Sequence, residues 1–235
     1  MSQLRNQDAR AVAYRALCLG ALLKRTELEL DIQDTEIDVD HTALHEKNNV
    51  LNRWLIDEHI NPHLSETEYH LLAKPLGTWS ERTLITVGWR TEALGIMLWA
   101  LNRLDDLLSY DKQFQPATIL SPLDIFNPTI DFIWLAELRP DTILSQARDQ
   151  AEAWNWRSRA RELKALGIRP PEGVTFNEII RFTAEKAYHN GHIGQPIYGD
   201  FPVLGKAYVD LTTDEYNLIS AIAYERNSAL SWICE

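Results

Sequence analysis

The side chains best suited to binding are arginines that stand beside tryptophans. Three such neighbours occur, Arg53-Trp54, Trp89-Arg90 and Trp156-Arg157. Adjacent helical residues point about 100° apart, so each tryptophan can face a core while its arginine reaches the rim. A guanidinium is a planar fork that grips a carboxylate or phosphate at two points. The competing interpretation is structural, because helical proteins commonly anchor long side chains at a core boundary in this way.

We predict a groove that takes a small anionic ligand or a protein partner, because aromatic and guanidinium side chains are what interfaces favour. The four residues expected to converge there are Arg90, Arg157, Asp200 and Lys206.

Charged residues at helical spacing also suggest a buried ionic network. Arg148 and Glu152 stand four residues apart, which places them on one helix face. Such networks are costly to desolvate, and they either fix one packing arrangement or shape a site. Both roles stay open. The expected members are Glu92, Arg148, Asp149, Glu225 and Arg226.

Histidines occur in near pairs, but the pattern does not favour a metal. The pairs are His41 and His45, His59 and His63, and His189 and His192. The first pair has helical spacing and acidic neighbours, which are possible ligands for a divalent ion. No HExxH motif accompanies it, and Val39 stands where a calcium loop starting at Asp34 requires glycine. We expect neither a metal nor a cofactor.

No complete catalytic motif is present. The chain has no GxSxG, and Ala207 follows Gly205-Lys206 where a P-loop needs serine or threonine. We therefore predict a binding or interaction module without catalysis. The alternative is a small hydrolase or metal-assisted enzyme that uses Glu92, Asp149 or His189 in a helical cleft.

The charge balance excludes some partners. The net charge is −11, which repels nucleic acid phosphates over most of the surface. Residues 27–46 hold eight acids and no lysine or arginine, and their early alternation predicts an extended acidic loop or a short edge strand. A third function is therefore a neutraliser that docks a basic effector protein through this stretch.

Helical periodicity dominates the rest of the chain. Apolar residues recur at helical spacing over 84–108, which predicts a central core helix, and further helices are expected over 141–166 and 213–233. Ser65 is expected to open a capping box, and Thr212 or Thr213 to cap the last helix. Glycines and prolines make 189–211 irregular, with room for one small hairpin. The expected fold is all-α, a single irregular bundle of residues 1–235 built around 84–108.

We predict a cytoplasmic protein without a membrane span. The chain has only two cysteines, no signal-like leader and no run of about 18 apolar residues.

Six stretches in a fixed order carry a family resemblance. They are RAVAYRALCLGALLKR, LSETEYHLLAKPLGTW, WRTEALGIMLWAL, ARDQAEAWNWRSRAREL, GDFPVLGKAY and ERNSALSWIC. Together they resemble a bacterial family described as a domain of unknown function, number 4272, from about Arg10 to Cys234. The resemblance implies a single mainly helical unit and transfers no activity, cofactor or catalytic residue. The acidic stretch 27–46 is longer than the family's usual connection, so its role would be local to this protein.

Overall fold

The computed structural model describes residues 7–34 and 40–235 and confirms a mainly helical protein with one two-stranded hairpin. The chain forms two compact units. Of the described residues, the amino-terminal unit comprises 7–107 without the gap at 35–39, together with Phe114–Arg139, and the carboxyl-terminal unit comprises Leu108–Gln113 and Pro140–Glu235. The single domain expected from the sequence stays a prediction. Across the described residues, every helix is too short or too polar to cross a bilayer.

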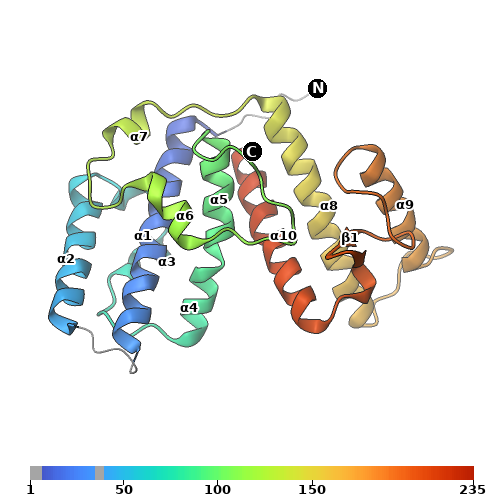
Figure 1. The fold of residues 1–235 in the computed structure, drawn as a ribbon, viewed down its shortest axis with the longest axis horizontal. Coiled ribbons are helices and arrows are strands. Elements are labelled where there is room, and N and C mark those ends of the chain that lie inside the picture. The colour runs from blue at the N-terminus through green and yellow to red at the C-terminus, as the bar shows by residue number, and fades with distance from the viewer. Residues whose placement is uncertain (1–6, 35–39) are drawn as a thin grey trace. The chain divides into compact units, whose positions relative to one another are not determined.

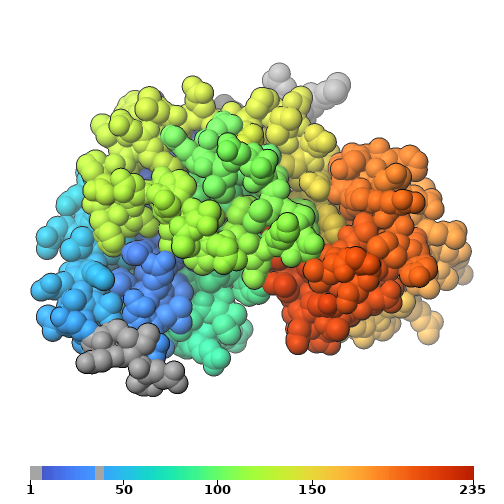
Figure 2. Space-filling view, in the orientation of Figure 1, coloured from blue at the N-terminus to red at the C-terminus, as the bar shows by residue number. Residues whose placement is uncertain are grey.

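The amino-terminal unit is organised around its first helix. Its elements are α1 (Ala9–Gln33), α2 (His41–Asp57), η1 (Asn61–His63), α3 (Glu66–Leu72), α4 (Glu81–Gly88), α5 (Arg90–Ala100), α6 (Pro116–Leu120), η2 (Ser121–Leu123) and α7 (Ile130–Trp134). Helix α1 packs against α2, α4, α5 and α7. The segment from α6 to α7 lies over α1 and α5 (Figure 1) and covers part of both on the face seen in Figure 2.

The acidic stretch 27–46 is helical at both ends, whereas its composition predicts a loop or a short edge strand. Helix α1 continues to Gln33 and α2 begins at His41, so the loop prediction was wrong at both ends of 27–46. The alternation of acidic and apolar residues also fits this helix, because it places Leu28 in the core and Glu29 four residues after Arg25. Residues 35–39 of the predicted loop lie outside the described part of the chain.

The predicted helix over 84–108 is two shorter helices. Helix α4 ends at Gly88 and α5 runs only to Ala100. Asn102 has a φ of 58°, and the Arg103 amide donates to the Leu98 carbonyl, which is the closing pattern of a helix. Helix α5 is nonetheless a core helix, because all its residues except Arg90 are buried.

Gly95 on α5 leaves space for an aromatic ring. A Cβ at this position would lie 2.3 Å from the Phe114 ring. Helix propensity alone would make Gly95→Ala stabilising by about 1 kcal/mol. We expect the clash to reverse the sign and to lower the free energy of unfolding by about 1–3 kcal/mol. Urea unfolding of Gly95→Ala measures the change in the free energy of unfolding. Gly88→Ala is the control, because a Cβ at Gly88 would meet nothing within 4 Å. Equal stability of both variants would contradict it.

The carboxyl-terminal unit is built on its first long helix. Its elements are α8 (Asp141–Ala165), α9 (Phe176–His189), β1 (Pro202–Val203), β2 (Lys206–Ala207), η3 (Tyr208–Asp210) and α10 (Thr213–Ile233). Helix α8 lies between α10 and α9 and packs against both (Figure 1). The hairpin pairs Pro202 with Ala207 and Val203 with Lys206. The predicted helices over 141–166 and 213–233, the Ser65 and Thr212 caps and the hairpin are confirmed.

Candidate functional site

A buried ion pair joins α8 to the loop that precedes the hairpin. Arg157 Nε and Nη2 each donate to one oxygen of Asp200, both at 2.6 Å. The two side chains are only 2% and 8% exposed. The Phe201 and Val209 amides also donate to this carboxylate, at 2.7 and 3.0 Å. Asp200 is therefore fixed by four donors, and it holds the guanidinium in one orientation.

A tight turn carries Asp200 to this position. The backbone groups of Ile197 and Asp200 form two mutual hydrogen bonds, each 3.0 Å long. The two residues between them, Tyr198 and Gly199, have φ values of 50° and 75°. A turn with both central residues in the left-handed region is type I′, which favours glycine at its second central position. Glycine also fits because a Cβ there would lie 3.0 Å from Arg181 Cγ.

Arg157 stacks on an aromatic ring and keeps one nitrogen without an acceptor. Its Cζ lies 4.3 Å from the centroid of the Tyr208 ring. Burial raises the pKa of Tyr208 to about 12, so its hydroxyl stays protonated and pairs with Ser158 at 2.8 Å. Arg157 Nη1 is buried and has no hydrogen-bond partner among the described residues. Buried donors are nearly always paired, so this nitrogen requires an explanation.

Arg157 and Asp200 line a pocket of about 760 Å³ in the carboxyl-terminal unit. Helix α8 contributes Arg161 and Lys164, and α9 contributes Asn177, Glu178 and Arg181. Tyr198 and Gly199 line it from the turn. We call this the basic pocket, because four cationic side chains share it with two carboxylates. Its volume suits a small-molecule ligand.

Among the described residues, three of the four cationic side chains of the basic pocket form no direct ion pair. They are Arg161, Lys164 and Arg181. Arg161 donates to the carbonyls of Tyr208 and Leu211, at 3.1 and 2.9 Å, and Lys164 Nζ lies 3.2 Å from Asn177 Oδ1. Within the described chain, no acceptor binds the Arg181 guanidinium. Hydrogen bonds from Thr175 lower the pKa of Glu178, which therefore stays ionised at the same wall. The pocket is still a positive region in a chain of net charge −11.

The comparisons with known proteins give the chain a family. The family model described as "Domain of unknown function (DUF4272)" matches residues 1–176. The chain belongs to this family. The DUF4272 match includes Arg157, but it ends before Arg181 and Asp200, and the last two of the six resembling stretches lie beyond it. No curated protein and no solved structure matches the chain.

The structure of this DUF4272 protein brings together two of the four residues predicted to line the groove. Arg157 and Asp200 form the buried pair. Lys206 on β2 pairs with Glu215, at 2.8 and 2.9 Å. Arg90 begins α5 in the amino-terminal unit. Convergence of all four residues stays a prediction. The sequence analysis did not identify Arg181 and Tyr198, which also line the basic pocket.

Three residues of the predicted ionic network, Arg148, Asp149 and Arg226, have partners within the carboxyl-terminal unit. Arg148 donates to its neighbour Asp149 at 2.8 Å, on a half-exposed face of α8. Arg226 donates to the carbonyls of Leu108 and Lys112, at 2.6 and 2.7 Å. Glu92 accepts from the Phe114 amide in the amino-terminal unit, and Glu225 is buried on α10. The five-member network stays a prediction.

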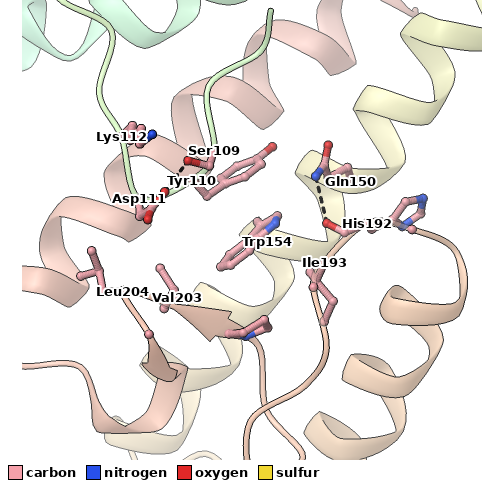
Figure 3. Close-up of a pocket in the computed structure, with 14 residues that line it drawn as sticks. Ser109, Tyr110, Asp111, Lys112, Gln150, Trp154, His192, Ile193, Val203 and Leu204 are labelled. Atoms are coloured by element: carbon pink, nitrogen blue, oxygen red, sulfur yellow. Dashed lines mark hydrogen bonds between the residues drawn. The ribbon is translucent and has the colours of Figure 1, made fainter.

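Arg226 also shapes a second pocket, of about 590 Å³ (Figure 3). The segment that it holds presents Tyr110, whose ring stacks on Trp154 with centroids 5.0 Å apart. Across the pocket, Gln150 Nε2 donates to the His192 carbonyl at 2.9 Å. Asp111 and Lys112 supply one charge of each sign. This pocket therefore has no excess of cations to attract an anion, unlike the basic pocket.

The described residues include no group of three histidine, cysteine, aspartate or glutamate side chains that could hold a metal ion. His189, named for the hydrolase alternative, lies at the end of α9 with Nδ1 2.7 Å from the Glu185 carbonyl oxygen.

Proposed function

We propose that this DUF4272 protein is a non-catalytic binding module of the cytoplasm, and that the basic pocket takes a small organic anion, a carboxylate or a phosphate. The single observation that carries the proposal is the buried Nη1 of Arg157, which lacks an acceptor among the described residues. A buried unpaired donor costs about 1–3 kcal/mol, and more on a charged group. An oxygen atom is the acceptor that would remove this cost, and an anion in the pocket can supply it directly or through a bound water.

The distribution of charge supports the same ligand class. Arg161 and Lys164 bind neutral oxygens, so their positive charge is available to a ligand. Arg181 adds a planar fork suited to two oxygen atoms. A concave pocket with a few converging polar groups is the usual form of a small-molecule site, so we favour such a ligand over a protein partner.

Arg181→Gln tests the proposal. It removes the cation of the pocket that has no acceptor among the described residues, so the affinity for inorganic phosphate should fall about tenfold, the effect of losing one charge-assisted hydrogen bond. Isothermal titration calorimetry of the full chain measures the change.

Arg159→Gln is the matched control. Arg159 is on α8, pairs with Glu162 at 2.6 Å and does not line the basic pocket, while its loss changes the net charge equally. We expect this variant to bind phosphate as the unmodified protein does, apart from a small long-range effect. Equal losses in both variants, or no binding of phosphate, acetate or their phenyl analogues by the unmodified protein, would refute the proposal.

A further inference from the structure

We infer that Tyr198 stacks on a planar ring of the ligand, so that the basic pocket takes an aryl or heteroaryl anion in preference to an aliphatic one. The inference rests on the proposed function, because it names the ligand class of the same site. The observations that carry it are the conformation, the exposure and the position of one side chain.

Tyr198 is in a backbone conformation that does not suit tyrosine. Its φ is 50°, in the left-handed region that L residues other than asparagine, aspartate and glycine rarely enter. Type I′ turns favour asparagine, aspartate or glycine at this first central position. The fold of the turn alone therefore gives no reason for a tyrosine here.

Packing gives no reason either. Tyr198 is 94% exposed, more than any other large hydrophobic residue described. The ring therefore recovers almost none of the apolar burial that stabilises an aromatic residue in a folded protein. Leu204 in the hairpin turn has a φ of 53° but is only 41% exposed, so Tyr198 differs from it in combining this conformation with nearly full exposure. That combination points to a role outside the stability of the fold.

The turn places this ring at the same site as the cations. Gly199 is the next residue, and a Cβ there would lie 3.0 Å from Arg181 Cγ, while Asp200 fixes Arg157. Tyr198 lines the basic pocket with both arginines. A ligand whose anionic group meets the guanidiniums can therefore lay an attached ring against Tyr198. The exposed ring needs no rearrangement to receive it.

Paired probes of equal charge test the inference by calorimetry on the full chain. Phenyl phosphate is compared with methyl phosphate, and benzoate with acetate, so that the second pair distinguishes a carboxylate site from a phosphate site. In whichever pair binds, we expect the dissociation constant of the phenyl probe to be about threefold to tenfold lower than that of its aliphatic partner. This is the gain in affinity expected from one aromatic stack.

The variants separate the ring from the charges. Tyr198→Ala should abolish the preference for the phenyl probe, measured as the ratio of the two dissociation constants within a pair. Tyr198→Asn should do the same in a residue that suits the turn, which excludes misfolding as the cause. Tyr188→Ala is the matched control, because Tyr188 is an exposed tyrosine on α9 that does not line the pocket.

The possible failures are distinguishable. Binding of methyl phosphate or acetate without a gain for the phenyl probe, or a gain that survives Tyr198→Ala, would overturn the inference and leave the proposed function standing. Absence of binding by all four probes would overturn both.

Discussion

Asp200→Asn should lower the free energy of unfolding by about 3–5 kcal/mol, because it breaks a buried ion pair and leaves one partner charged. Each carboxylate oxygen of Asp200 accepts from one Arg157 nitrogen and one backbone amide. The asparagine side chain has no negative charge and only one acceptor oxygen, so it cannot accept from all four donors. Arg157, which is only 1% exposed, would then carry an uncompensated charge in the core of the carboxyl-terminal unit. Denaturation in urea measures the change.

Two further variants make this result specific. Asp210→Asn changes an exposed aspartate of the same unit, and we expect an effect below about 0.5 kcal/mol. Replacing both partners, as Arg157→Met with Asp200→Leu, should recover much of the loss, because no unpaired charge remains. A stability of Asp200→Asn equal to that of Asp210→Asn would show that the pair does not hold the turn in place.

Arg25→Met should also lower the free energy of unfolding by about 3–5 kcal/mol, this time in the amino-terminal unit. Arg25 and Glu29 are completely buried, with Nη2 and Oε1 2.6 Å apart. Arg25 also donates to Asn48 on α2 and to the Leu72 and Lys74 carbonyls. The variant would leave a buried carboxylate without its counter-charge and three acceptors without a donor.

Glu29 connects the same pair to the loop after α3. Its Oε2 accepts from the Gly77 amide at 2.9 Å, the Trp79 amide at 3.2 Å and Gln33 Nε2 at 3.0 Å. Glu29→Gln should therefore destabilise the unit as well, and amide hydrogen exchange should quicken at Gly77 and Trp79. Retained protection of both amides would contradict this role.

The matched control lies on the same helix. Glu27 pairs with Lys24 at 2.6 Å, but these side chains are 37% and 31% exposed. Exposed pairs contribute about 0–1 kcal/mol, so Glu27→Gln should change stability little. A loss as large as that of Arg25→Met would mean that burial does not set the cost.

The sequence predicted what depends on local spacing. The Ser65 capping box and the ends of α8 and α10 were found, because a cap and a helical stripe can be identified within a few residues. It missed Glu29, since an acidic, alternating stretch suggested a loop, although Arg25 stands four residues earlier at ion-pair spacing.

The basic pocket was predicted only in part, because its members are distant in sequence. Asp200 is 43 residues from Arg157, and only the fold shows that they meet. Arg181 carried no motif of its own. Tyr198 did carry a signal, because a tyrosine directly before glycine in a glycine-rich stretch can indicate a type I′ turn with an unusual first residue.

The most direct test of anion binding is a titration of the isotope-labelled full chain with phenyl phosphate and benzoate, followed by two-dimensional NMR. We expect saturable shifts of the backbone amides in 157–165, 177–181 and 198–200, which surround the basic pocket. Shifts centred on Tyr110 and His192 instead, or no saturable shift with either probe, would contradict it.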